Sequence, residues 1–262
     1  MPESSDIVAP LLSDPLFYAV AVPAVLIFGI SKSGFGGALG GLSVPLLALV
    51  ISPVQAAAIL LPIICLMDLL TVWAYRGKWV IGELRLLVPS ALIGIAVGTL
   101  LFGYVSADVL RLLVGTTALL FAVHYWMHLR ASARAVTRDV PKPVGVAASA
   151  VAGFTSFIAH AGGPPLSMYL LRRSLDKTQF VARAAAFFAA VNYVKLVPYA
   201  ALGQLELANL KTSLMLAPLA PVGIAMGIWL HRRIADRLFF GLACLLLFAI
   251  SLKLISDGIQ GF

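Results

Sequence analysis

Charge is scarce in this sequence. Only 11% of its 262 residues are charged, against roughly 25% in an average soluble domain. Hydrophobic residues make up 61%, and a soluble fold of this length has too much surface to cover with so few charges. The same composition excludes intrinsic disorder, which needs a polar chain. We therefore expect an integral membrane protein.

Cysteine is almost absent as well. Cys65 and Cys244 lie in different apolar stretches, so neither a disulfide framework nor a cysteine metal site is expected. No secretory signal is indicated, because the first ten residues carry acids where such a signal carries bases. We expect no metal and no cofactor.

The surplus of positive charge does not indicate nucleic-acid binding. The formal net charge is +8, but no basic residue precedes Lys32, and most of the others lie in short loops between apolar runs. Such loops orient membrane proteins, whereas a nucleic-acid interface gathers its cations on one face. The expected partners are the lipid bilayer and a small anionic substrate, with no nucleic acid.

Long apolar runs divide the chain into segments of membrane-crossing length. A helix needs about 20 apolar residues to cross roughly 30 Å of hydrocarbon. Glycines and prolines break the longest uncharged run, 33–67, into shorter parts. The pattern predicts an all-α integral membrane protein with 8–10 membrane segments. The ten apolar segments are 16–31, 35–51, 56–75, 86–105, 109–128, 144–159, 163–172, 180–200, 210–230 and 236–256.

The loop cations sort to one side of the membrane if these segments alternate in direction. Thirteen fall on one side: Arg76, Lys78, Arg85, Arg130, Arg134, Arg138, Lys142, Arg172, Arg173, Lys177, Arg232, Arg233 and Arg237. Only Arg111, Lys211 and Lys253 fall on the other. By the positive-inside rule the first side is cytoplasmic. We therefore expect a multi-pass protein of the inner cell membrane with both termini extracytoplasmic.

The two halves of the chain resemble each other at a fixed offset. At an offset of 124 the matched pairs are Gly29 and Gly153, Leu42-Ser43 and Leu166-Ser167, Gln55 and Gln179, Asp68 and Asn192, and Tyr75 and Tyr199. At 129 they are Pro89 and Pro218, Gly94 and Gly223, and Gly98 and Gly227. We expect an extracytoplasmic tail over 1–15, a first repeat over 16–129, a basic cytoplasmic linker over 130–143 and a second repeat over 144–258.

Each repeat holds five segments, an odd number, so the second repeat enters the membrane from the opposite side. Inverted repeats of this kind are the architecture of many secondary transporters. The inversion holds whether the first two segments of a repeat cross the membrane twice or form a re-entrant hairpin. In both cases the chain returns to the same side.

Glycine-rich breaks interrupt the start of each repeat, over 29–45 and 153–169. Paired glycines let backbone approach a ligand closely, and a broken helix directs a dipole end at the gap. Lys32 adds a full charge and serines and threonines add hydroxyl donors, which suits an anion. The candidate ligands are Lys32, Ser33, Phe35, Gly36, Gly37, Thr155, Ser156, His160, Gly162 and Gly163. For the mid-segment glycines Gly94, Gly98, Gly223 and Gly227 we favour close helix packing instead.

These hairpins resemble those of the TauE/SafE sulfite exporter family, also called the toluene sulfonate uptake permease family. The resemblance covers roughly residues 20–258, and its most specific element is the repeated glycine-rich hairpin that ends in Leu-Ser-x-Pro or Leu-Ser-x-Tyr. The second hairpin departs from the commoner three-glycine run, with Ala161-Gly-Gly-Pro-Pro165 after His160. The resemblance implies transport of sulfur-containing anions such as sulfite and organosulfonates.

A polar stripe follows in the third segment of each repeat. Asp68 lies on one helical face with Thr71 and Tyr75. Asn192, Lys195 and Tyr199 occupy the equivalent positions, and we add Asn192 and Lys195 to the substrate site. Charged side chains within spans face the protein interior, so Asp68 is the candidate proton carrier. The alternative is a structural ion pair between Asp68 and Lys195.

Three further side chains have ordinary explanations beside functional ones. Arg183, in the first turn of its segment, either extends to the interface or belongs to a gate. Gln55 and Gln179 stand at segment entrances, where helix-end hydrogen bonding is favoured over ligand binding.

The favoured function is a secondary transporter of small sulfur-containing anions, working by alternating access with export as the favoured direction and proton coupling through Asp68. The alternatives are an anion channel or a permease for small organic carboxylates. An enzyme is not expected, because the chain has neither an H-E-x-x-H nor a G-x-S-x-G run and only one deep acid. ATP-driven transport is disfavoured because there is no P-loop.

Overall fold

The structure is a computed structural model that describes residues 14–37, 39–102, 141–170, 173 and 175–233, with scattered positions between 104 and 127 and between 245 and 261. The described residues contain helices and no strand. The predicted all-α fold is confirmed. The tail, most of the linker, and most of the fifth and tenth segments lie outside the described residues.

Among the described residues five helices are long and apolar enough to cross a membrane, and a bent helix pair makes a sixth if it is counted as one span. The five are α2 (Pro15–Phe35), α4 (Pro53–Ala74), α5 (Ile81–Phe102), α7 (Lys142–Ala159) and α9 (Lys177–Ala201). The bent pair is α10 (Leu207–Leu216) and α11 (Leu219–Arg233), which meet at 46°. Three short helices complete the set: η1 (Gly40–Leu42), α3 (Ser43–Leu47) and α8 (Gly163–Leu170).

Local capping sets where the long helices begin. The side chain of Ser52 accepts a hydrogen bond from the Gln55 backbone N–H at the start of α4. Asp176 does the same for Gln179 at the start of α9. Each cap satisfies one of the backbone donors that a helix start leaves unpaired. The two glutamines therefore stand in the first turns of their helices, as predicted.

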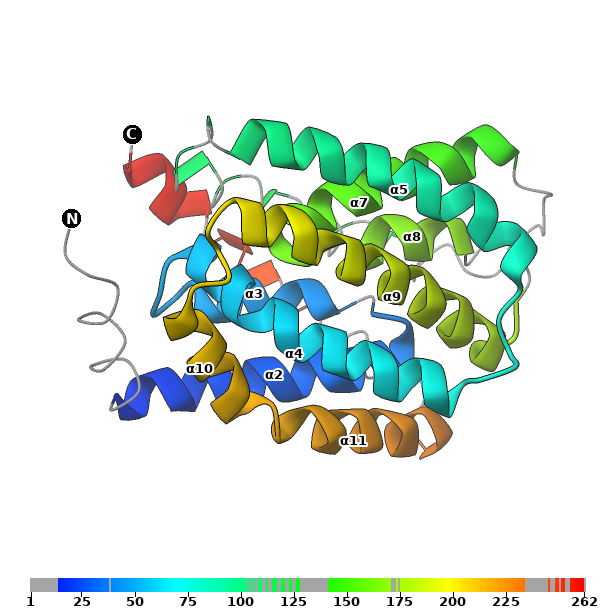
Figure 1. The fold of residues 1–262 in the computed structure, drawn as a ribbon, viewed down its shortest axis with the longest axis horizontal. Coiled ribbons are helices and arrows are strands. Elements are labelled where there is room, and N and C mark those ends of the chain that lie inside the picture. The colour runs from blue at the N-terminus through cyan, green and yellow to red at the C-terminus, as the bar shows by residue number, and fades with distance from the viewer. Residues whose placement is uncertain are drawn as a thin grey trace.

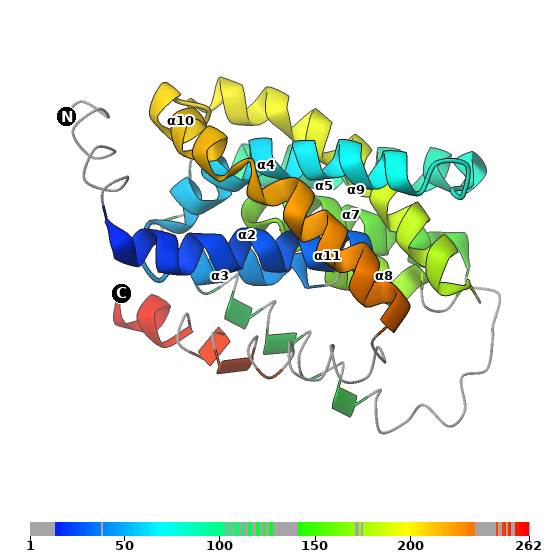
Figure 2. The same ribbon diagram turned by 90° about the horizontal axis from the view of Figure 1, so that it is seen from below.

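The helices of the two halves are interleaved. In Figure 1, α4 and α9 run side by side in opposite directions through the centre, and Asn192 bonds to Asp68 across them. α11 packs against α2, which it crosses in Figure 2, and α5 packs against α7. Each of these outer pairs joins a helix of the first half to a helix of the second, so neither half forms a separate bundle.

Glycines allow these outer pairs to approach closely. A Cβ added to Gly29 of α2 would lie 2.9 Å from the backbone of Gly223 of α11. A Cβ on Gly94 of α5 would overlap the Ala150 carbonyl oxygen of α7. Gly98 and Gly227 are equally confined. The prediction that these mid-segment glycines serve helix packing is confirmed.

Equivalent contacts recur at the 124-residue offset. The Tyr75 hydroxyl donates to the Ser33 carbonyl oxygen at 2.6 Å, and the Tyr199 hydroxyl donates to the Phe157 carbonyl oxygen at 2.6 Å. Both members of the second pair lie 124 residues beyond those of the first. Together with the opposite directions of α4 and α9 in Figure 1, this recurrence is compatible with inverted repeats.

Each glycine-rich hairpin consists of a long helix, a break and a short helix. Gly36 caps the end of α2 and His160 caps the end of α7, and both capping residues have left-handed backbone (φ 63° and 52°). The short helix α8 has eight residues, or roughly 12 Å at helical rise, too little to cross the membrane as helix alone. The predicted breaks are confirmed.

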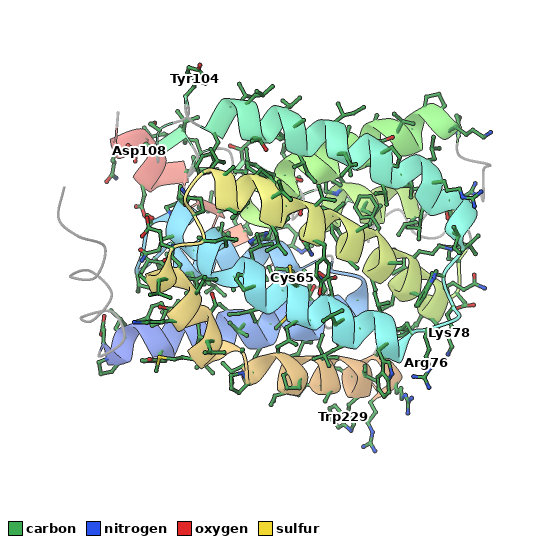
Figure 3. The ribbon with its side chains drawn as sticks, in the orientation of Figure 1. Cys65, Arg76, Lys78, Tyr104, Asp108 and Trp229 are labelled. Atoms are coloured by element: carbon green, nitrogen blue, oxygen red, sulfur yellow. The ribbon has the colours of Figure 1, made fainter. Side chains whose placement is uncertain are left out.

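Cations from two of the predicted cytoplasmic loops gather at one end of the molecule. Arg76 and Lys78 lie there with Trp229, whereas Tyr104 and Asp108 lie at the opposite end (Figure 3). At the first end the Arg76 guanidinium stacks on Trp73, and that of Arg233 stacks on Trp229. Aromatic and basic side chains of this kind are typical of a membrane interface.

Candidate functional site

A buried ion pair lies between the first hairpin and α4. Lys32 Nζ is 2.7 Å from Asp68 Oδ1, and the two side chains are 3% and 0% exposed. Asn192 Nδ2 of α9 donates to the other carboxylate oxygen, Oδ2, at 2.7 Å. Because Asp68 and Asn192 are equivalent in the two halves, the site lies where those halves meet.

A second buried lysine lies beside the end of α7. Lys195 Nζ donates to the Ser156 carbonyl oxygen at 2.8 Å, to Ser156 Oγ at 2.9 Å and to His160 Nδ1 at 2.8 Å. His160 Nε2 lies 2.9 Å from the Ala57 carbonyl oxygen. Since a carbonyl only accepts, Nε2 carries the proton and Nδ1 is left as the acceptor for the ammonium. The contacts thus define a neutral imidazole with one tautomer.

The two hairpins contact each other. A Cβ added to Gly41, just after the first break, would lie 3.1 Å from the Cβ of Ala161 in the second break. The Phe188 ring of α9 lies against both Gly37 and Gly162, and its centroid is 5.8 Å from Lys32 Nζ. The Phe28 ring lies on the same ammonium at 5.5 Å. Lys32 therefore lies in an aromatic-lined interior shared by the two breaks.

Several predicted ligands use their polar groups within the protein. The Ser33 hydroxyl lies near the carbonyl oxygens of Gly29 and Ile224, at 2.9 Å from each. The Thr155 hydroxyl donates to the Val151 carbonyl one turn earlier. Phe35 is buried at the end of α2. Gly163 begins α8. Five of the predicted ligands place their side chains in one buried cluster, called the buried centre below: Lys32, Ser156, His160, Asn192 and Lys195.

The alternative ion pair between Asp68 and Lys195 is wrong. Asp68 pairs with Lys32, whereas Lys195 bonds to Ser156 and His160. The reason is the opposite direction of α4 and α9. Lys195 lies one turn beyond Asn192, where its ammonium reaches Ser156 and His160 at the end of α7.

An ionic cluster that the sequence did not reveal joins three segments near the cation-rich end. Glu83 of α5 pairs with Arg183 of α9 and with Arg173, whose Nε lies 3.2 Å from Glu83 Oε1. The Tyr169 hydroxyl of α8 donates to the same carboxylate at 3.0 Å. Glu83 was missed because the fourth segment was expected to begin at residue 86, beyond it. Arg183 is paired, so it does not simply extend to the interface.

A separate pocket opens at this end of the molecule. It has a volume of about 790 Å³ and is lined by residues 77–80 and 176–179. None of the side chains of the buried centre lines it. No group of His, Cys, Asp and Glu that could hold a metal ion occurs in the described part of the chain.

Comparison with known proteins gives one result. No curated protein and no solved structure matches the chain. The family model named Sulfite exporter TauE/SafE matches residues 21–254, which includes both hairpins, the buried lysines and the ionic cluster around Glu83. The chain therefore belongs to the TauE/SafE sulfite exporter family of membrane transporters.

Proposed function

We propose that this protein is a secondary transporter of small sulfur-containing anions, such as sulfite or organosulfonates, in the inner membrane, with both termini extracytoplasmic. The observation that carries the proposal is the buried pair of Lys32 and Asp68 at the meeting of the two halves. Export is the direction we favour. The candidate site is completed by the hairpin backbone at Gly36, Gly37, Gly162 and Gly163.

Lys32 is the group best suited to hold the substrate. Among the described residues its ammonium has one ionic partner, Asp68, and otherwise faces the rings of Phe28 and Phe188. An ammonium with three donors and one partner retains capacity for an anion. The carboxylate of Asp68 then occupies the place that a substrate anion takes in the loaded state.

Coupling to protons follows from this competition. Two anions beside one buried ammonium leave an uncompensated charge, which is costly in a buried site. A substrate anion therefore enters most readily when Asp68 is protonated, because a like charge favours the neutral carboxyl. Anion and proton move together in this scheme, one of each per cycle, so net export requires an outward anion gradient that exceeds the inward proton gradient.

The Glu83 cluster supports alternating access. It ties α5 and α9 together with α8 at the cation-rich end, and the Glu83 side chain is only 10% exposed. Opening the buried centre toward this end requires these segments to separate, so Arg183 serves as part of a gate. Lys32 and Asp68 are closed off from solvent in the present state.

A permease for small organic carboxylates is the second candidate. The specific observation in its favour is that Lys32 already binds a carboxylate, that of Asp68. A sulfonate and a carboxylate both offer oxygen acceptors on one negative charge, so direct competition between the two classes distinguishes the candidates.

Anion binding to the purified protein tests the proposal. Sulfite and methanesulfonate should raise the Tm of the wild type more than acetate at equal ionic strength. The variant K32A/D68N, which removes the ammonium without leaving a lone carboxylate, should lose that response. K78A, which removes a cation from the pocket lined by residues 77–80 and 176–179, should keep the response to anions. An equal response in K32A/D68N would show that Lys32 does not hold the anion.

A further inference from the structure

Lys195 has no donor to spare for a substrate. Its ammonium carries three N–H bonds, and the structure provides three acceptors: the Ser156 carbonyl oxygen, Ser156 Oγ and His160 Nδ1, at 2.8, 2.9 and 2.8 Å. The side chain is fully buried. It differs in this respect from Lys32, whose ionic partner is Asp68 alone among the described residues.

The three acceptors stand at a place in the fold that suits a cation. Ser156 belongs to the last turn of α7, which ends at the left-handed residue His160. The carbonyl end of a helix carries partial negative charge, and unwound carbonyl ends of broken helices hold coupling cations in secondary transporters. The imidazole of His160 adds Nδ1 as an acceptor, because its Nε2–H donates to the Ala57 carbonyl oxygen.

The first repeat lacks this arrangement. The positions equivalent to Ser156, His160 and Lys195 are Lys32, Gly36 and Thr71. In the first repeat the lysine is Lys32 of α2, and its partner, Asp68, lies on α4. In the second repeat the lysine is Lys195 of α9, the helix equivalent to α4. The Thr71 hydroxyl donates back to the Met67 carbonyl of its own helix.

We propose that the end of α7 is a monovalent cation site, selective for a primary ammonium, which the protein fills permanently with its own Lys195. The tethered ammonium takes the place of a free coupling cation, and Lys195 does not bind the substrate. The role as a replacement for a coupling cation rests on the proposed transport function; the cation site itself does not. Anion transport by the wild type should accordingly proceed without sodium.

Refilling the site with a free amine tests the proposal. Lys195→Ala removes three carbons and the ammonium, a volume that matches propylammonium. The purified Lys195→Ala protein should have a lower Tm than the wild type, and propylammonium chloride should raise that Tm in a saturable manner. Tetramethylammonium, which has no N–H donor, should have no such effect at equal ionic strength. The wild type should not respond to propylammonium, because its site is already filled.

Lys195→Met is the matched control, since its side chain fills the space without a donor and leaves no room for the amine. If Lys195→Ala is extracted only in low yield, growth and purification in propylammonium should restore the yield. A Tm or yield that is independent of propylammonium, or raised equally by tetramethylammonium, would overturn the proposal. An anion-binding failure in the wild type would overturn the transport function and leave this result unaffected.

Discussion

At the residue scale, the centre depends on two buried lysines with different surroundings. Lys32 is compensated by one carboxylate, that of Asp68, and Lys195 by three neutral acceptors. Loss of a carboxylate leaves a bare buried charge, whereas loss of a neutral acceptor removes only one hydrogen bond. Substitutions at the two sites therefore have different consequences for stability.

Asp68→Asn should lower the free energy of unfolding by about 3–5 kcal/mol, because Lys32 keeps its charge without a partner. Adding Lys32→Met should recover most of that loss. Thermal unfolding of the single and double variants in detergent measures both effects. The control is Asp68→Asn with Lys195→Met, which should be no more stable than Asp68→Asn alone. Recovery by Lys195→Met in place of Lys32→Met would mean that the ion pair is assigned to the wrong lysine.

Residue types were easier to predict than residue pairs. Position within an apolar segment was enough to single out Lys32, Asp68, Asn192 and Lys195 as interior groups. Which lysine meets Asp68 depends on the rotation and stagger of antiparallel helices, which one sequence does not contain. Glu83 was missed because it precedes the expected start of the fourth segment, and only packing brings it against Arg173 and Arg183.

At the element scale, two tyrosines hold the broken helices. In a continuous helix the Gly37 N–H would bond to the Ser33 carbonyl, but at this break it bonds to the Ser31 carbonyl. The Ser33 carbonyl instead accepts a hydrogen bond from the Tyr75 hydroxyl. At the second break the Phe157 carbonyl accepts from Tyr199. A buried carbonyl without a donor costs about 1–3 kcal/mol, so each tyrosine stabilises one hairpin.

Tyr199→Phe should therefore lower the unfolding free energy by about 1–3 kcal/mol and weaken anion binding, as measured by thermal unfolding with and without methanesulfonate. Tyr193→Phe is the control on the same helix. Its hydroxyl donates to the Cys65 carbonyl at 3.3 Å and its side chain is 39% exposed, so its loss should cost less. Equal effects of the two substitutions would argue against a special role of Tyr199 at the hairpin.

The glycines of the outer helix pairs give a second prediction at this scale. Gly94→Ala should destabilise the protein by about 1–3 kcal/mol or more, because the new methyl group overlaps the Ala150 carbonyl. Gly82→Ala, in the same helix, meets nothing within 4 Å and should be neutral or mildly stabilising. Thermal unfolding of the two variants measures this difference in stability. A Gly94→Ala protein as stable as the wild type would contradict the close packing of α5 against α7.

The long helices were predictable because apolar residues dominate each of them, but the caps Ser52 and Asp176 start α4 and α9 three residues before the expected 56 and 180. The ninth segment was expected to be continuous over 210–230, but it bends between α10 and α11. Pro218 and Pro221 lie at and just beyond the bend, and each removes a backbone donor. The angle of such a bend depends on neighbouring helices and not on the local sequence.

At the scale of the whole molecule, alternating access between two repeats requires the halves to be inverted in the membrane. The cation-rich end should face the cytoplasm, and the N-terminus should face outward. In a variant in which Cys65 and Cys244 are replaced, Ser4→Cys and Val136→Cys should react with an impermeant thiol reagent from opposite sides. Labelling from one side only would contradict the inversion.

Uptake of labelled methanesulfonate into proteoliposomes tests whether Lys32 and Asp68 carry out proton-coupled anion transport. Methanesulfonate keeps its charge across the working pH range, so any response to a pH gradient reflects the protein. An acidic exterior should accelerate uptake by the wild type, because Asp68 must be protonated for the anion to reach Lys32. Asp68→Asn should bind the anion but show no response to the gradient. Undiminished pH-driven uptake by a well-folded Asp68→Asn protein, or no uptake by the wild type, would contradict the account.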